Sequence, residues 1–458
     1  MTSPLRNILS VTTLLLWLLT PVLTMAASWQ ISGSNTLGAR LVPALIESWL
    51  QQQGIAFERS TVAENEVAYQ LVPALSGLDS IRVHAHGSST AFADLASGVA
   101  QIGMSSRRIR DAEVDMLAAL APMQDPHHEI VIGLDGVAVI VPPDNTLQTL
   151  SMAQLRRAFA GSLRDWRELT RERSGAIRLY ARDSKSGTFG VFDDLVMGGL
   201  DIAATAQRFE SNELLAESVS SDASALGFTS VAAVEDVRAV TISASANRPI
   251  APQPLMLMTE DYPLSRRLYL YVPQPDDALL QRWLEYVLSP AGQQVVSASG
   301  FTNLELFAVA AELPAQAPDS YRKLLTGARR LAVNFRFDEK QVRLDSKARR
   351  DVARVADYVR QHADALTDLL VLGFSDALEV AEVHSIMLSN DRADAVAAEL
   401  LRAGIPATSV RGFGSAIPVA DAADSNRNRR VEIWVRSDPN ATRRPYRSLS
   451  RTSVAKSN

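Results

Sequence analysis

The chain has 458 residues, enough for two to four domains of about 100 to 200 residues each. Its residues are 47% hydrophobic and 21% charged, which excludes a largely disordered chain and a multi-span membrane protein. It has no cysteine, which excludes disulfides, thiol nucleophiles and cysteine-ligated metal sites. The formal charge of −5 is uneven, because residues 319–458 hold 24 basic and 18 acidic residues. The acidity of the remainder argues against nucleic-acid binding.

The N-terminus has the pattern of a secretory signal peptide. Arg6 precedes an apolar run, Ile8–Leu23, and Thr24-Met25-Ala26 supplies small residues at the −3 and −1 positions of a cleavage site. The alternative is an uncleaved membrane anchor, but the run is short for a bilayer core of about 30 Å and contains Pro21. We predict a signal peptide at 1–26 and a mature protein that starts near Ala27, outside the cytoplasm.

Hydrophobic patterning divides the rest of the chain into two folded parts. Residues 27–307 alternate short β-branched runs with helical patterns, which is typical of an α/β domain. Residues 308–325 are rich in Pro and Ala and are expected to form a linker. Residues 326–437 combine two helical patterns with apolar strand-like runs and are expected to form a smaller α+β domain. The Arg-rich segment 438–458 has no periodicity and is predicted to be a disordered tail.

Three turns of Gly, Ser and Thr each precede an amphipathic helical pattern in the first domain. They are Gly33-Ser34-Asn35-Thr36, Gly87-Ser88-Ser89-Thr90 and Ser186-Gly187-Thr188. A helix N-terminus presents unpaired N–H groups and a partial positive charge, so three of them together would hold a small anion. The alternative for each turn is a Ser or Thr that only caps its own helix.

Arg182 lies four residues before Ser186. Its guanidinium group could bind the same anion with two hydrogen bonds, while hydroxyl and amide groups satisfy the other oxygens. The alternative is a surface arginine in a solvated loop. Because the domain is acidic, affinity for an anion would have to come from such local donors.

A set of short motifs in this order resembles the phosphate-binding proteins of ABC transporters (PstS-like), over about 270 residues. The resemblance implies an α/β, two-lobed periplasmic-binding-protein fold of type II, whose lobes are joined by crossing strands and close on one phosphate. It implies as ligand residues Thr36, Leu37 by its backbone N–H, Ser88, Ser89, Arg182, Ser186, Gly187 and Thr188. The motifs are Gly33–Leu37, Gly87–Phe92, Ile102–Arg107, Asp135–Val141, Phe159–Gly161 with Trp166, Ser186–Thr188, Tyr262–Ser265 and Ser289–Gln293.

One position departs from the PstS-like pattern in a way that matters chemically. Gln101 stands in Gly98-Val99-Ala100-Gln101-Ile102-Gly103, where the family usually has an aspartate. A carboxylate accepts the proton of hydrogen phosphate and repels sulfate, whereas an amide can donate or accept. We therefore expect Gln101 to line the site, and we expect weaker discrimination of phosphate from sulfate than in the family.

The second domain places an acid and a base near each other. Asp376 follows the apolar run that ends in Gly373-Phe374-Ser375, and Arg392 lies at the start of the next helical pattern. One interpretation is a plain structural salt bridge. The other is a site for a zwitterionic amino acid, with Asp376 binding the ammonium group and Arg392 the carboxylate.

These pieces resemble the OmpA-like domain that binds peptidoglycan. The resemblance implies that Asp376 and Arg392 bind diaminopimelate of the peptide stem. Phe374 replaces a usual histidine and Ser385 a usual asparagine, which affects the supporting hydrogen bonds. The matching pieces are Phe335–Asp338, Gly373–Asp376, Leu388-Ser389 with Arg392-Ala393, Gly404-Ile405, Gly412–Gly414 and Asn428–Ile433.

The combined prediction is an exported protein that captures phosphate or a similar oxyanion and is anchored to the cell wall. Its expected location is the periplasm, on peptidoglycan and near the outer membrane, with an ABC-transporter permease as a further partner. The alternative is a structural envelope protein with a degenerate binding domain, which Gln101 would favour. We expect no cofactor, no metal site and no enzyme activity, because the sequence has no activated nucleophile and no His-Glu-x-x-His motif.

Overall fold

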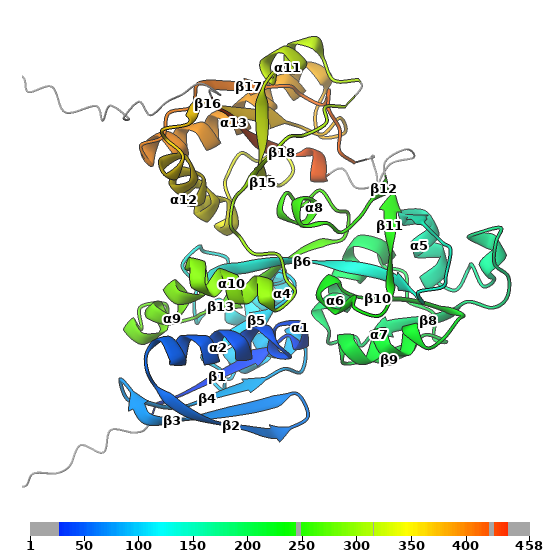
Figure 1. Ribbon diagram of the computed structural model, residues 1–458, viewed down its shortest axis with the longest axis vertical. Helices are drawn as coiled ribbons and strands as arrows, with labels where there is room; N and C mark the ends of the chain where they lie inside the picture. The colour runs from blue at the N-terminus through cyan, green and yellow to red at the C-terminus, as the bar shows by residue number, and fades with distance from the viewer. Residues whose placement is uncertain (1–26, 244–248, 315, 421–425, 438–458) are drawn as a thin grey trace, which may run out of the picture.

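The computed structural model describes residues 27–243, 249–314, 316–420 and 426–437 (Figure 1). The strands of these residues form a 13-stranded sheet and a separate five-stranded sheet. The predicted signal peptide at 1–26 and the predicted tail at 438–458 lie outside the described residues. Among the helices described, none has the length and apolar character needed to cross a membrane.

The first lobe contains the N-terminal half of the large sheet. Its strand order is β2-β3-β4-β1-β5-β13-β6, and β1 pairs in parallel with both β4 and β5. The rings of Trp29 and Trp49 stack in its core beside Trp283. The strands are β1 (Ala27–Gly33), β2 (Ala56–Ala63), β3 (Glu66–Leu75), β4 (Leu78–His84), β5 (Ile102–Ser105), β6 (Glu129–Val141) and β13 (Ser265–Tyr271), and the helices are α1 (Asn35–Gly38), α2 (Leu41–Gln52), α3 (Ser88–Ala96), α4 (Asp111–Leu117), α9 (Ala278–Leu288) and α10 (Pro290–Ala298).

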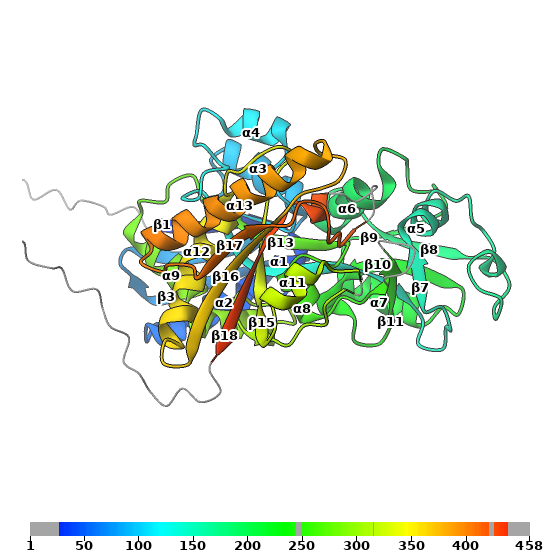
Figure 2. The ribbon, with the colours of Figure 1, turned by 90° about the horizontal axis from the view of Figure 1, so that it is seen from above.

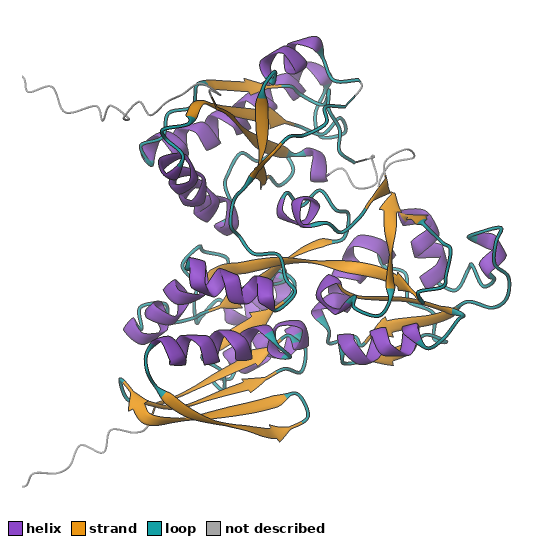
Figure 3. Cartoon of the chain, viewed as in Figure 1, coloured by secondary structure: helices purple, strands orange, loops and turns teal. Residues whose placement is uncertain are grey.

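The second lobe continues the same sheet through β6-β10-β8-β9, with β11, β7 and β12 attached (Figure 3). The rings of Phe159, Phe192 and Phe228 contact one another in its core. The strands are β7 (Thr149–Ser151), β8 (Arg178–Arg182), β9 (Gln207–Phe209), β10 (Ala225–Ser230), β11 (Arg238–Ser243) and β12 (Pro249–Ile250), and the helices are α5 (Met152–Phe159), η1 (Trp166–Glu168), α6 (Gly187–Phe192), η2 (Asp193–Met197), α7 (Asn212–Ser220), η3 (Val231–Ala233) and α8 (Pro254–Met258).

Strand β6 joins the two lobes. Its residues 129–136 pair with β13, and its residues 137–141 pair with β10 and β11. All 13 residues of β6 are buried, which explains why this stretch reads as a nearly continuous apolar run. The prediction of a two-lobed α/β fold with a strand crossing between the lobes is confirmed.

The C-terminal domain is built on the five-stranded sheet, as the predicted smaller α+β domain requires. Side chains of β16 and β18 alternate between two cores: α12 and α13 cover one face, and α11 covers the other. The strand order is β14-β15-β18-β16-β17. The elements are β14 (Ala308–Val309), α11 (Asp319–Leu324), β15 (Ala328–Arg336), α12 (Ser346–Gln361), β16 (Leu366–Phe374), α13 (Glu382–Arg402), β17 (Ser409–Gly412) and β18 (Arg430–Ser437).

Residues 308–325, where a linker is expected, carry ordered structure. Ala308 and Val309 pair with β15 as an edge strand. The side chains of Ala317, Tyr321 and Leu325 are buried in the core under β16 and β18. The described part of this segment therefore packs as part of the C-terminal domain.

The C-terminal domain also packs against the first domain through buried ion pairs. The Asp261 carboxylate accepts hydrogen bonds from Arg330 (2.9 Å) and Arg336 (2.7 Å) of β15. The Arg350 guanidinium of α12 donates to the Glu129 carbonyl (2.7 Å), and the Arg267 side chain pairs with Asp345. Figure 2 shows the C-terminal sheet above the first lobe, with α5, β7 and β8 of the second lobe to one side.

Candidate functional site

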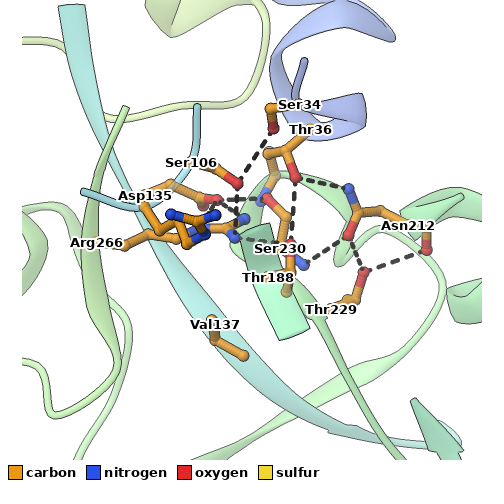
Figure 4. A network of polar contacts seen from close by, with 12 residues as sticks. Ser34, Thr36, Ser106, Asp135, Val137, Thr188, Asn212, Thr229, Ser230 and Arg266 are labelled. Carbon is orange, nitrogen blue, oxygen red and sulfur yellow. Dashed lines mark hydrogen bonds and ion pairs between the residues drawn. The ribbon is translucent and has the colours of Figure 1, made fainter. Parts of the chain in front are cut away.

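A cluster of polar side chains lies where the two lobes meet (Figure 4). On the first lobe, the parallel strands β1 and β5 end immediately before Ser34 and Ser106, and β4 ends shortly before Ser88. On the second lobe, β8 ends at Arg182 and its parallel neighbour β10 ends at Ser230. Because the carboxyl ends of parallel strands meet at one edge of a sheet, these side chains converge between the lobes.

Thr188 is the point at which both lobes and the crossing strands connect. Its hydroxyl group lies 3.2 Å from the hydroxyl of Thr36 on the first lobe. The Arg266 guanidinium on β13 donates to the same hydroxyl (2.7 Å), and the Arg182 guanidinium lies at 3.4 Å. Asn212 on α7 donates to Thr36 at 3.2 Å. Two cations and the Thr36 hydroxyl therefore converge on the Thr188 hydroxyl.

The close approach of the lobes depends on Gly187. A Cβ atom at this position would lie 2.2 Å from the Ser88 Oγ and 2.3 Å from the Ser106 Oγ, both on the first lobe. The Ser88 Oγ also accepts a hydrogen bond from the Ser106 backbone N–H (3.1 Å). Only a residue without a side chain fits at position 187 in this arrangement.

Arg182 is buried and held rigidly. Its Nε donates to the Phe209 carbonyl at 3.1 Å, and its terminal nitrogens donate to the Asn212 side chain and the Glu210 carbonyl. Burial lowers the pKa of Arg182 to about 10, and the nearby Arg266 cation acts in the same direction. The group stays protonated at neutral pH, and an anion beside it would replace the solvation that burial removes.

Arg266 of β13 and Asp135 of the crossing strand β6 form a buried ion pair. The Asp135 Oδ2 accepts hydrogen bonds from Arg266 Nε (2.9 Å) and from the Ser230 hydroxyl (2.8 Å). Both side chains are only 1% exposed. The Asp135 Oδ1 is also buried, and no described group donates to it. The cluster thus contains one carboxylate oxygen free to accept a proton-bearing group.

Most of the residues predicted from the sequence lie at this junction. Thr36, Ser88, Arg182, Gly187 and Thr188 belong to the cluster. Leu37 is buried in α1 directly after Thr36. The helices α1, α3 and α6 begin here, as the three turns predict.

Two of the predicted hydroxyl groups have other contacts. The Ser186 Oγ accepts from the backbone N–H groups of Thr188 and Phe189, so the expected alternative of a helix cap applies to it. Ser89 is exposed, and its Oγ accepts from Arg107 at 3.2 Å.

The structure does not bring Gln101 to the cluster. Gln101 immediately precedes β5, at the end of the strand opposite to Ser106. Its side chain is exposed, and its Oε1 accepts from the Gln30 backbone N–H at 2.8 Å. The expectation that Gln101 lines the anion site is therefore corrected, and Ser106 is the residue of this motif that reaches the cluster.

Asp135, Asn212 and Arg266 also belong to the cluster, although none of them was predicted from the sequence as a site residue. Asp135 had a detectable signal, because it is a charged residue inside a run that otherwise reads as a buried strand. Arg266 follows the Tyr262–Ser265 motif directly. Asn212 has no local pattern that indicates its role.

In the second predicted site, around Asp376 and Arg392, the loop between β16 and α13 supplies the ion-pair partner of Arg392. Both Arg392 and Glu379 have side chains that are 0% exposed, and they form an ion pair at 2.5 Å. Arg392 also donates to the carbonyls of Gln341 and Asp338. Asp376 instead accepts from the Asn428 side chain at 2.8 Å. Among the described residues, the ion-pair partner of Arg392 is Glu379 and not Asp376.

Replacing Glu379 by glutamine is expected to lower the free energy of unfolding of this domain by about 3 to 5 kcal/mol, because Arg392 would be left buried without a counter-charge. Burial raises the pKa of Glu379, but Arg392 outweighs this and holds it below its ordinary value of 4.5. The carboxylate therefore contributes stability above that pH and loses it on acidification. Melting curves at pH 7 and pH 3 should show the difference between Glu379→Gln and the wild type shrinking at the lower pH.

The matched control is Glu399→Gln, which removes an exposed carboxylate paired with Arg402 on α13. Exposed pairs of this kind contribute at most about 1 kcal/mol. Equal melting temperatures for the two variants would contradict a buried role for Glu379.

Comparison with known proteins identifies family models that match the two domains. The model for the PBP superfamily domain matches residues 47–291, and the model for the OmpA family matches residues 336–432. The phosphate-binding protein PstS of Pseudomonas aeruginosa is 27% identical over 299 residues, covering 59% of this chain and 90% of PstS. PstS of Bacillus subtilis is 25% identical over 222 residues, covering 48% and 70% of the two chains.

Among solved structures, an ABC-type phosphate transport receptor from Vibrio cholerae superposes with a TM-score of 0.46 at 23% identity, covering 60% of this chain and 98% of the receptor. The PBP superfamily match covers more than half of the 458 residues. The chain therefore belongs to the PBP superfamily and carries a C-terminal domain of the OmpA family.

Proposed function

We propose that this protein captures phosphate between its two lobes. The observation that carries the proposal is the convergence of two buried guanidinium groups, Arg182 and Arg266, on the hydroxyl of Thr188. Guanidinium groups and hydroxyls are the donors that saturate the oxygens of a small oxyanion. The similarity to PstS, which is named as a phosphate-binding protein, supports phosphate as the ligand.

Asp135 supports phosphate over sulfate. Hydrogen phosphate carries a proton that a carboxylate oxygen can accept, whereas sulfate at neutral pH has none and is repelled by it. The buried Oδ1 of Asp135, to which no described group donates, is suited to this role. Because Gln101 lies away from the cluster, it gives no reason to expect weak discrimination between phosphate and sulfate. For the same reason, Gln101 does not support the alternative of a degenerate binding domain.

The OmpA domain supports attachment to the cell wall. We place the diaminopimelate of a peptide stem at Asp376 and Arg392, the residues that the family resemblance implies. In the closed arrangement, the Glu379 carboxylate takes the place beside Arg392 that a ligand carboxylate would need. Wall binding therefore requires Glu379 to leave Arg392. The expected location is the periplasm, where captured phosphate would pass to a permease.

Calorimetry on residues 27–458, freed of phosphate by unfolding and refolding, tests the capture proposal. Phosphate is expected to bind with micromolar or tighter affinity, and sulfate at least 100-fold more weakly. Binding of neither anion would contradict capture, and equal binding of both would contradict the role of Asp135. Co-sedimentation of the same protein with peptidoglycan sacculi tests anchoring separately, with Asp376→Ala as the variant expected to lose binding.

His86 is expected to make phosphate affinity pH-dependent. It lies on the first lobe and bridges Glu66 (3.0 Å) of that lobe and Glu210 (3.2 Å) of the second lobe. Burial lowers the pKa of His86, but the two carboxylates outweigh this and raise it above 6.5. The protonated form therefore favours contact between the lobes at low pH, and this contribution is lost as the pH rises through the raised pKa.

The measurement is the ratio of wild-type to His86→Gln affinity at pH 6 and pH 8, because the ionisation of phosphate itself cancels in this ratio. The ratio is expected to fall by about fivefold at most, the range of a partly exposed ion pair. His127→Gln, a change at an exposed histidine away from the cluster, serves as the control. A pH-independent ratio for His86→Gln would show that this bridge does not assist closure.

A further inference from the structure

A second group of arginines lines a cavity of about 480 Å³ where the two domains meet, here called the junction cavity, which shares Arg266 with the phosphate cluster. Four parts of the chain form its walls: the segment after β5, the helices α6 and η2 of the second lobe, residues 260–269 at the start of β13, and the OmpA domain. Among the described residues, nine arginines and four carboxylates line it. A cavity with this excess of one charge concentrates ions of the opposite charge.

Ion pairing leaves part of this positive charge available to a ligand. At least six of the nine arginines have carboxylate partners: Arg107, Arg108, Arg110, Arg266, Arg267 and Arg336. Four of those partners, Glu113, Glu129, Asp135 and Asp261, are not among the lining residues and contact the arginines from behind the wall. Within the described residues, Arg343 and Arg429 form no ion pair; the Arg429 Nε donates to the Phe337 carbonyl at 3.1 Å.

One donor in the cavity wall lacks an acceptor. The Nε of Arg336 is buried, and no described group accepts a hydrogen bond from it. Burial also lowers the pKa of Arg336, which the neighbouring Asp261 only partly offsets. A buried N–H group without an acceptor is unfavourable. Because Arg336 lines the cavity, an anion there would offset the solvation that its charge loses on burial.

The neighbouring cavity does not share this positive excess. A neighbouring cavity of about 780 Å³ shares Arg108 and Arg343 with it. Its lining balances three arginines with the carboxylates of Asp125, Asp338, Glu339 and Asp345. The excess of arginines in the junction cavity is therefore not shared by the cavity next to it.

We propose that the junction cavity binds a small linear polyphosphate, an anion of two or three phosphates joined through shared oxygens. Cavities of about 300 to 1,000 Å³ hold ligands much larger than a single phosphate ion. Several guanidinium groups at different points of the wall match an anion with charges spaced along a chain. The aromatic rings in the lining, such as Tyr262 and Phe337, are buried, so the cavity has no exposed ring on which a nucleobase would stack.

Such a ligand would contact both lobes and the OmpA domain at once. It is distinct from the phosphate proposed at Thr188, and its binding does not depend on that proposal. The arginines best placed to test it are Arg343 and Arg429 of the OmpA domain, because neither belongs to the phosphate cluster and neither forms an ion pair among the described residues.

The test is calorimetric titration of residues 27–458 with tripolyphosphate, in buffer already containing saturating orthophosphate. The wild type is expected to bind, and the double variant Arg343→Gln/Arg429→Gln to bind at least tenfold more weakly. The control Arg82→Gln/Arg171→Gln changes the net charge equally at two exposed arginines outside the lining and should bind like the wild type. The single variant Arg343→Gln, an exposed side chain, is expected to weaken binding about threefold without changing the melting temperature.

Two results would overturn the proposal. One is the absence of tripolyphosphate binding to the phosphate-saturated wild type. The other is an equal loss of affinity in the cavity variants and the control, which would indicate a general effect of net charge.

Discussion

Replacing Asp135 by asparagine is expected to lower the free energy of unfolding by about 3 to 5 kcal/mol, because Arg266 would remain buried without its counter-charge. The same change removes the carboxylate that repels sulfate, so sulfate affinity should rise at least tenfold. Phosphate loses the acceptor for its proton and should bind no more tightly than before. Calorimetry with both anions and a urea titration measure these two effects in one variant.

Asp194→Asn is the matched control, because it also removes one carboxylate charge from an ion pair between the lobes. The Asp194 side chain, which pairs with Arg110, is more than half exposed. A surface pair contributes at most about 1 kcal/mol, so this variant should keep its stability and selectivity. Added sulfate should raise the melting temperature of Asp135→Asn more than that of the wild type, since a ligand stabilises the state that binds it. If Asp135→Asn keeps the wild-type selectivity for phosphate over sulfate, Asp135 does not belong to the binding site.

Replacing Gly187 by alanine is expected to weaken phosphate binding by at least 100-fold. The added Cβ would lie within 2.3 Å of the hydroxyl oxygens of Ser88 and Ser106, so the lobes could not approach as closely. Thr188 would then be separated from Thr36 and from Arg266, so the donors of the two lobes would no longer lie together. Because position 187 lies in the first turn of α6, alanine should not weaken the helix itself.

Gly190→Ala in the same helix is the control. A Cβ there would also face the first lobe, but it would meet the Cδ of the long Arg107 side chain at 3.0 Å and not a short serine side chain. Phosphate affinity should stay within about threefold of the wild type. Tight phosphate binding by Gly187→Ala would contradict a site that depends on contact between the lobes.

The main features of the fold could be predicted because they follow from local pattern. The apolar run at 129–141 is fully buried in β6, and the three Gly/Ser/Thr turns do begin helices at the junction of the lobes. The two cores that β16 and β18 separate follow from the alternation of side chains along a strand.

The error at Gln101 has a geometric cause. Gln101 and Ser106 belong to one short motif, but five residues of extended chain span about 16 Å. They therefore lie at opposite ends of β5, and only the carboxyl end faces the second lobe. The order of motif residues does not by itself show which end of a strand each occupies.

The pairing of Arg392 with Glu379 could not be predicted for a different reason. The loop between β16 and α13 has no periodicity, so its path depends on tertiary contacts. In this loop the Asp376 carboxylate accepts a hydrogen bond from Asn428, and the Glu379 carboxylate forms the ion pair with Arg392. Similar long-range contacts place Asn212 beside Thr36, 176 residues apart in the chain.

The contacts between the OmpA domain and the first domain determine which part of the molecule is free to move. Among the described residues, its hydrogen bonds and ion pairs to the first domain end on residues 126–129 and 259–267, at or beside β6 and β13. Residues 137–243 form most of the second lobe, to one side of these contacts (Figure 2), whereas Met258 of α8 packs in one core with Ala332 of the OmpA domain. If the OmpA domain is fixed to the wall, the first lobe and α8 are fixed with it. Residues 137–243 are then the part that can move to close on a ligand without displacing the OmpA domain.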